Sequence, residues 1–136
     1  MVKEVVHDPI LLGIPSQPAT KEDLPIAQDL LDTLVANKAS CVGMAANMIG
    51  QFKRIIVFDC EGKLMVMLNP EIISASGEYE TEEGCLSLDG VRPTTRYQII
   101  EVEYQDFDWK TQKVKLSGWT AQIVQHEVDH LSGRII

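Results

Sequence analysis

Apolar residues recur at helical spacing near the start of the chain. Asp23 is a candidate helix cap, and Pro25 suits a first helical turn. The apolar positions that follow lie three, four or one residues apart: Ile26, Leu30, Leu31, Leu34 and Val35. This spacing predicts an amphipathic helix that ends near Asn37 and buries one stripe of side chains.

The same spacing returns at the end of the chain. From Thr120 onward the apolar positions again suit one face of a helix: Ile123, Val124, Val128 and Leu131. Gly133 is a natural stop, because glycine readily adopts the left-handed conformation that closes many helices. A final helix is therefore predicted from about Thr120 to Gly133.

The segment between the two helices has the pattern of β-strands. Residues 54–59 and 63–69 are rich in β-branched and apolar side chains around a turn at residues 60–62. Residues 97–105 alternate between apolar and charged positions, and residues 110–116 are a plausible partner strand. Strands gathered between two helices predict an α+β domain, with small mixed or antiparallel sheets around the C-terminal helix.

Composition limits the class of protein. The 136 residues, of which 45% are hydrophobic and 24% charged, suit one globular domain spanning residues 1–136. The net charge of −8 argues against binding to nucleic acid or to an anionic membrane, since both require a positive field. The longest early apolar stretch, residues 10–12, is too short for a signal peptide or a membrane span.

The three cysteines suggest a reducing, cytoplasmic setting. Cys41, Cys60 and Cys85 cannot all pair with one another, and nothing else in the sequence suggests export. In a reducing compartment, an isolated cysteine in a chain with histidines suggests metal binding or catalysis.

The final predicted helix carries the sequence His126-Glu127-Val128-Asp129-His130. Residues four apart lie on the same face of a helix, so both imidazoles can reach one ion. Glu127 lies beside them and could take a proton from water at that ion. The alternative is a solvated helix with two surface histidines, but the apolar neighbours favour burial, and buried polar groups need partners.

An open catalytic site needs a third metal ligand. Cys85 follows Gly84, which would let the backbone approach closely, and a thiolate suits zinc or ferrous iron. Cys41 and Cys60 compete for this role, although free cysteines are often only small buried apolar residues. Spacing alone leaves this choice open.

Three segments resemble the motifs of peptide deformylases, which remove the formyl group from nascent bacterial polypeptides. Residues 41–48, Cys-Val-Gly-Met-Ala-Ala-Asn-Met, resemble Gly-x-Gly-x-Ala-Ala-x-Gln. Residues 83–87 are Glu-Gly-Cys-Leu-Ser, and residues 125–130 contain Gln-His-Glu-x-x-His, both complete. The similarity extends from about residue 8 to the C-terminus.

The resemblance implies roles for individual residues at the reaction centre. Cys85, His126 and His130 would hold one divalent metal, and Glu127 would act as general base and then general acid. The Leu86 backbone N–H would face the oxyanion formed at the formyl carbon. The resemblance favours Fe²⁺, while Zn²⁺, Ni²⁺ and Co²⁺ also suit one cysteine and two histidines.

The resemblance also implies where a peptide would bind. Val42 and Gly43 would pair with its main chain as an added strand, and Ile123 and Trp119 would line the methionine pocket. A core position for Trp119 is the alternative. Arg92 matches an arginine thought to hold the far end of the peptide, unless it is only a solvated charge. The implied partners are N-formylated nascent peptides and the ribosome that produces them.

Three positions depart from the family pattern. Gln122 is polar where relatives are usually apolar, and Cys41 replaces the first glycine of the first motif. Met48 replaces a glutamine that donates a hydrogen bond to the formyl oxygen, whereas a thioether cannot donate. Losing one such donor typically costs roughly a hundred- to a thousand-fold in rate. Asn47 carries an amide, but on a helix it would point about 100° away from that position.

Two main hypotheses follow. The first is a divergent deformylase, with an intact metal centre and weakened support for the transition state. The second is a deformylase-like protein that binds metal and holds peptide N-termini without efficient hydrolysis. The retained Glu127 favours the hydrolase, because a binding protein has no evident need for it. A metalloprotease would also use His-Glu-x-x-His, but residues 83–87 argue against that reading.

Overall fold

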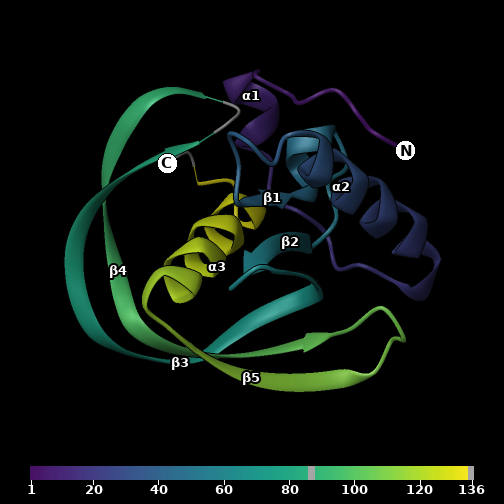
Figure 1. The fold of residues 1–136 in the computed structure, drawn as a ribbon. Helices are drawn as coiled ribbons and strands as arrows, with labels where there is room; N and C mark the ends of the chain where they lie inside the picture. Colours follow the sequence, from purple (N-terminus) through teal and green to yellow (C-terminus); the bar gives the residue numbers. More distant parts are fainter. Residues whose placement is uncertain (86–87, 135–136) are drawn as a thin grey trace.

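The fold is α+β, as the sequence predicts, with one antiparallel sheet curved around the C-terminal helix (Figure 1). The computed structural model describes residues 1–85 and 88–134, and the side chains of residues 85, 88 and 89 are also outside the description. In chain order the elements are α1 (Pro9–Leu12), the 3-10 helix η1 (Lys21–Asp23), α2 (Leu24–Ala36), β1 (Gly43–Ala45), the 3-10 helix η2 (Ala46–Ile49), β2 (Ile55–Cys60), β3 (Lys63–Cys85), β4 (Leu88–Gln105), β5 (Thr111–Ser117) and α3 (Gly118–Leu131).

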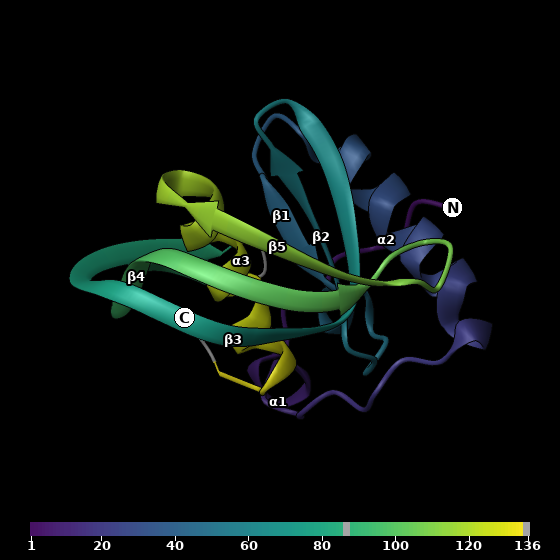
Figure 2. The same ribbon diagram turned by 90° about the horizontal axis from the view of Figure 1, so that it is seen from below.

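The five strands form one sheet in the order β1-β2-β3-β4-β5, rather than several small sheets. Every neighbouring pair is antiparallel, and β1 lies at one edge. The hairpin of β3 and β4 is long and bends around α3 (Figures 1 and 2). Register shifts, two of them in its first half and one at Gly84/Cys85, interrupt its ladder, and such irregularities increase the local twist and bend of a strand.

The hairpin is much longer than its sequence pattern predicts. We expected strands over residues 63–69 and 97–105, whereas β3 and β4 continue to meet at Cys85 and Leu88. Acidic residues are depleted in strands, so the acidic residues of β3 made its later part hard to recognise as a strand from the sequence. They nonetheless occupy alternate, exposed positions, as a strand requires: Glu78, Glu80 and Glu82.

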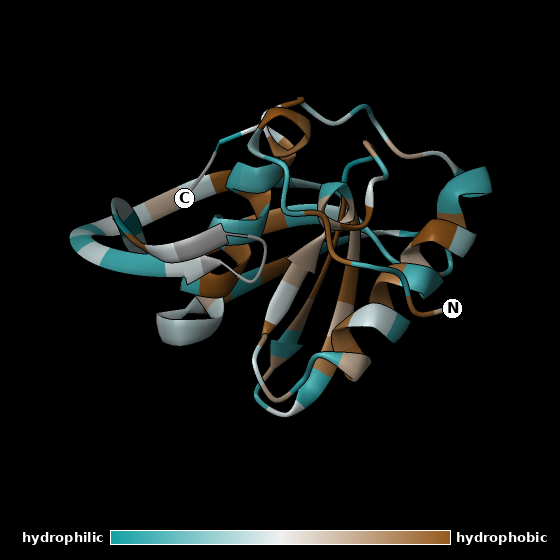
Figure 3. Ribbon diagram, turned by 90° about the horizontal axis from the view of Figure 1, so that it is seen from above, coloured by the Kyte–Doolittle hydropathy of each residue, from teal (hydrophilic) through white to brown (hydrophobic). Residues whose placement is uncertain are grey.

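Helix α2 covers the face of β1 and β2 opposite to α3 (Figure 2). Its apolar stripe is turned toward the strands, and its outer face is polar (Figure 3). The buried positions are Ala27, Leu30, Thr33 and Leu34. Val35 is 52% exposed, so its expected place in the buried stripe was wrong. Ala27 and Thr33, which the apolar pattern did not include, are fully buried.

Helix α3 packs against β1, β2, β4 and β5 and is largely buried. It begins two residues earlier than predicted and ends at Leu131. Gly133 has a φ of +80°, and the N–H of Arg134 donates to the Asp129 carbonyl oxygen at 3.1 Å, which is the hydrogen bond of a Schellman motif. Within the described ranges, no helix is both long and apolar enough to cross a membrane.

Candidate functional site

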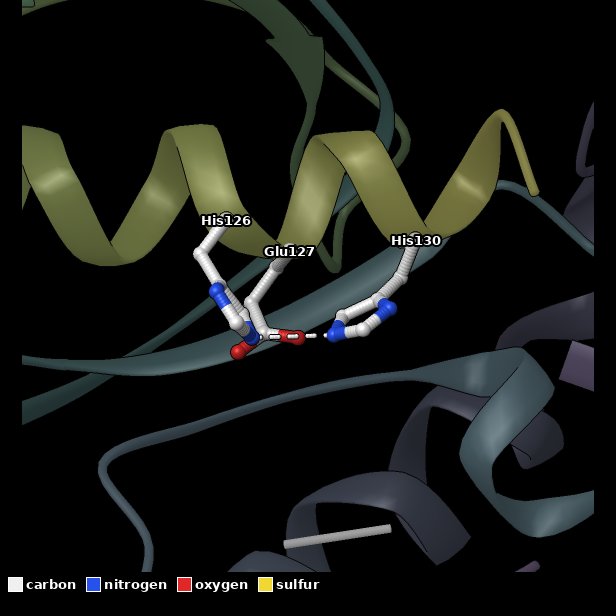
Figure 4. A group of neighbouring side chains, drawn as sticks. All are labelled: His126, Glu127 and His130. Carbon is white, nitrogen blue, oxygen red and sulfur yellow. Dashed lines mark hydrogen bonds between the residues drawn. The ribbon is translucent and has the colours of Figure 1, made fainter. Parts of the chain in front are cut away.

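Three polar side chains of α3 converge on one buried point (Figure 4). The Nε2 atoms of His126 and His130 lie 2.9 Å apart, and the Glu127 carboxylate lies beside them. The possible ligand atoms of the three residues are within 4.8 Å of one another. The exposed fractions are 8% for His126, 4% for Glu127 and 1% for His130, so the alternative of a solvated helix was wrong.

The donor set fits a divalent cation. His126 Nδ1 lies 2.8 Å from Glu83 Oε1; because a carboxylate only accepts, this nitrogen carries the proton and Nε2 keeps its lone pair. Among the described residues, neither His130 Nδ1 nor Glu127 Oε1 has a hydrogen-bond partner, although both atoms are buried. A cation between the two Nε2 atoms would use both lone pairs, and its charge would compensate the buried carboxylate.

Glu83 orients His126 from the other side. Its Oε1 accepts from His126 and from Arg96 Nη2 at 2.7 Å, while Oε2 accepts from Arg96 Nε at 3.0 Å and Gln122 Nε2 at 2.8 Å. Burial alone would raise the pKa of Glu83, but these hydrogen bonds outweigh it and hold that pKa at about 2. The carboxylate is therefore charged and keeps His126 in one tautomer and one orientation.

Arg96 joins the hairpin to the helix. Its Nη1 donates to Asp129 Oδ2 at 2.6 Å, and Asp129 Oδ1 accepts from Arg134 at 3.2 Å. The sequence pattern predicted no role for Glu83, Arg96 or Asp129. Glu83 and Asp129 were visible inside the second and third motifs, whereas nothing in the sequence connects Arg96 on β4 with them.

Burial shifts the protonation of the central groups. Desolvation raises the pKa of Glu127 to about 7, and the negative charge of Glu83 adds to this shift. Desolvation lowers the pKa of His130 to about 3, so its imidazole stays neutral. A neutral imidazole is the form that binds a metal, and a carboxyl group that titrates near neutral pH suits two-way proton transfer.

A cavity of about 220 Å³ opens beside these groups. Its lining includes His126 and Glu127 together with the predicted peptide-binding residues Val42, Gly43 and Ile123. Trp119 also lines it and is 63% exposed, so the alternative of a core position was wrong. Arg92 lies opposite Glu83 in the β3–β4 ladder, is half-buried, and is absent from this lining.

Gly43 lets β1 approach α3 closely. A Cβ atom built on Gly43 would lie 2.9 Å from Ile123 Cγ2 and 3.0 Å from Glu127 Oε2. Real Cβ atoms essentially never approach another heavy atom more closely than 3.0 Å. Any larger residue would therefore displace Ile123 or Glu127 from the edge of the cavity.

Met48 and Asn47 have different surroundings. Met48 lines the cavity, and its Sδ accepts a hydrogen bond from the Ala45 N–H at 3.3 Å. Asn47 is fully buried, and its Nδ2 donates instead to the His130 carbonyl oxygen at 2.8 Å. The amide of Asn47 is thus bonded to the backbone of His130, and it does not replace the glutamine donor that is missing at position 48.

For Cys85, the predicted third ligand, the structure describes the backbone alone. The backbone of Cys85 ends β3, two residues after Glu83, but its side chain and all of Leu86 lie outside the described residues. Cys60 ends β2 opposite Lys63 at a hairpin turn. Cys41 lines the cavity, and its Sγ donates to the Gly43 carbonyl oxygen at 2.8 Å.

Comparisons with known proteins agree with this arrangement. The family model described as polypeptide deformylase matches residues 4–136. A peptide deformylase of Clostridium beijerinckii is 51% identical over 136 residues, the whole of both chains. A peptide deformylase of Dictyoglomus thermophilum is 42% identical over 142 residues, covering all of this chain and 91% of its own.

Solved structures give the same result. A peptide deformylase from Legionella pneumophila has a TM-score of 0.89 at 34% identity, covering 99% of this chain and 83% of that one. A class I type b peptide deformylase from Acinetobacter baumannii with Met-Ala-Ser bound has a TM-score of 0.87 at 28% identity, covering 98% of this chain and 96% of that one.

Proposed function

The chain belongs to the polypeptide deformylase family, and we propose that it hydrolyses formyl-methionyl peptides through Glu127 with a rate limited by Met48. The family consists of metalloenzymes that deformylate nascent peptides. The observation that carries the proposal is the convergence of His126, Glu127 and His130, of which His126 and Glu127 line the cavity beside β1. The proposal treats residues 1–136 as one functional domain that acts in the cytoplasm, where nascent chains emerge from the ribosome.

The two histidines would hold the metal together with Cys85. When bound, a divalent cation supplies Lewis acidity, which polarises a carbonyl group and makes water more acidic. Ferrous iron is the proposed native ion, and zinc, nickel or cobalt would also suit this donor set. Glu83 keeps the Nδ1 proton on His126, so that Nε2 is always available as a ligand.

Glu127 would move the proton. Its carboxylate would take a proton from the attacking water and then deliver that proton to the amine nitrogen that leaves the formyl carbon. In the metal-free site burial raises the pKa of Glu127 to about 7, which favours the protonated form that delivers the proton, and the charge of a bound cation would favour the carboxylate that accepts it. The Leu86 N–H is the proposed donor to the oxygen on which negative charge develops.

The peptide would bind along β1. This strand is at the edge of the sheet, and edge strands can pair with an extended peptide. Val42 and Gly43 would provide the main-chain hydrogen bonds, and Ile123 would contact the methionine side chain in the cavity. The Acinetobacter relative binds Met-Ala-Ser, a peptide that begins with methionine. Arg92 is the proposed contact for the distal part of the peptide.

An assay with a formyl-Met peptide and oxygen-free ferrous protein tests this function. We expect release of formate with metal-dependent turnover, slower than in relatives with glutamine at position 48. Protein freed of metal by a chelator is the control and should be inactive until metal is restored. Metal-loaded protein that binds the peptide without releasing formate would instead support the alternative, a catalytically weak binding protein for peptide N-termini.

Met48→Gln should increase deformylation by roughly a hundredfold, about 3 kcal/mol in the barrier. The introduced amide oxygen can accept the Ala45 N–H that now reaches Met48 Sδ, which leaves the amide N–H groups free to face the cavity. The gain should occur mainly in kcat, because the donor acts on charge that exists in the transition state.

Met48→Leu is the matched control for that gain. It keeps an apolar side chain without a donor, so its kcat should stay near that of the unaltered protein. If Met48→Gln leaves kcat unchanged in folded, metal-loaded protein, the missing donor does not limit the rate. Another group must then support the oxyanion.

A further inference from the structure

Gln122 belongs both to the cavity and to the support of a candidate metal ligand. It lines the cavity one helical turn before His126. Its Nε2 donates to Glu83 Oε2 at 2.8 Å, and its Oε1 accepts from the Tyr79 hydroxyl at 3.2 Å. These contacts form a continuous series from Tyr79 through Gln122 and Glu83 to His126.

We propose that Gln122 is a positioning residue that connects the substrate cavity to His126 through Glu83. Two donors reach each carboxylate oxygen of Glu83: Arg96 and His126 at Oε1, and Arg96 and Gln122 at Oε2. Removing the Gln122 donor leaves Oε2 with one partner in a buried site, which carries a desolvation cost. The carboxylate then relaxes toward its remaining partners and holds the imidazole of His126 less firmly.

Glu83 and Tyr79 together determine which way the Gln122 amide faces. A glutamine amide can be placed in two orientations that differ by exchange of oxygen and nitrogen. The charged Glu83 carboxylate only accepts hydrogen bonds, and the Tyr79 hydroxyl can donate. Together they favour the orientation in which Nε2 faces Glu83 and Oε1 faces Tyr79. Tyr79 and Glu83 lie four residues apart on β3, so both can present side chains on the same face.

These contacts explain why the cavity lining is polar at Gln122, where the family pattern is usually apolar. An apolar side chain would line the cavity equally well, but it could not donate to Glu83. A peptide side chain in the cavity would contact the same Gln122 that supports Glu83. Only this statement about substrate rests on the proposed function. Occupying the cavity would therefore restrain His126 further.

Two substitutions separate the hydrogen bond from the shape of the side chain. Gln122→Met keeps the length but has no donor, whereas Gln122→Lys restores a donor toward Glu83. The primary measurement is the rate at which cobalt-loaded protein loses its ion to a chelator, which requires no enzymatic activity. We expect roughly tenfold faster loss for Gln122→Met, at the lower end of the 10–100-fold cost of losing a partner near a ligand.

Further variants complete the test. Gln122→Lys should lose cobalt within about threefold of the unaltered rate, and Tyr79→Phe should lie between the two Gln122 variants. Gln125→Met is the matched control, since Gln125 lies on the same helix but its amide bonds to the backbone of Tyr97. That control should reduce the melting temperature of the metal-free protein without accelerating cobalt loss.

The outcomes distinguish a positioning role from a structural one. With a formyl-Met peptide, Gln122→Met should lower kcat more than it changes KM. Equal cobalt loss in Gln122→Met and the unaltered protein would overturn the proposal, as would faster loss that Gln122→Lys fails to reduce. Absence of deformylation in every variant would contradict the proposed function, but the cobalt measurements would still decide the role of Gln122.

Discussion

Replacing Glu127 by glutamine should lower kcat for formyl-Met peptides by roughly 10³- to 10⁴-fold while leaving the metal content unchanged. The amide has nearly the shape of the carboxylate but cannot accept a proton from water or return one to the leaving amine. Glu127 Oε1 has no hydrogen-bond partner among the described residues, so the substitution breaks no bond at that atom. Steady-state kinetics and elemental analysis of the same preparation measure the two quantities.

Glu103→Gln provides the matched control for that experiment. Glu103 is on β4, its side chain is 42% exposed, and it forms a long ion pair with Lys113 at 4.0 Å. The same chemical change there should leave kcat unaltered. If Glu127→Gln retained activity within a small factor, proton transfer would have to proceed through another group.

Replacing Cys85 by alanine should abolish tight metal binding. Oxygen-free preparations of the unaltered protein should hold close to one ion per chain. Losing a partner of a ligand costs about 10–100-fold in affinity, so losing a ligand should cost more than roughly a hundredfold. Competition with a chelator of known affinity measures the loss, and deformylation should disappear with the metal.

The other two cysteines test the choice of ligand. Cys60→Ala should retain the metal, because Cys60 lies at the β2–β3 turn and is absent from the cavity lining. Cys41→Ala should also retain it, although Cys41 lines the cavity. Equal metal content in Cys85→Ala and the unaltered protein would exclude Cys85, and loss in Cys41→Ala alone would assign the role to Cys41.

The parts of the site that a single helix determines could be predicted from the sequence. His126, Glu127 and His130 are close in sequence, and the helical repeat alone places them together. Strong periodicity likewise predicted α2 and α3 to within two residues at each end. The departure at Met48 was also readable, because a thioether cannot donate in any conformation.

The supporting contacts could not be predicted, because they depend on strand register. Glu83 lies 43 residues before His126 in the chain, and only the bent hairpin brings the two together. The acidic positions made β3 hard to recognise in the sequence, so its pairing with β4 could not be predicted. In that pairing Arg96 lies opposite Tyr79, and its side chain reaches Glu83. Gln122 was visible only as a departure, since its role requires Tyr79 and Glu83 to be in position first.

The bent β3–β4 hairpin also affects how the protein is held together. Its first strand, β3, ends at Cys85, whereas the two histidines lie roughly forty residues later on the helix that the hairpin surrounds. With Cys85 as third ligand, a bound ion would act as a reversible cross-link that closes this long loop. Such a closure removes conformational entropy from the unfolded chain, and binding free energy then becomes folding free energy. Metal supply would thus govern the resistance of the hairpin end to proteases as well as the rate of the reaction.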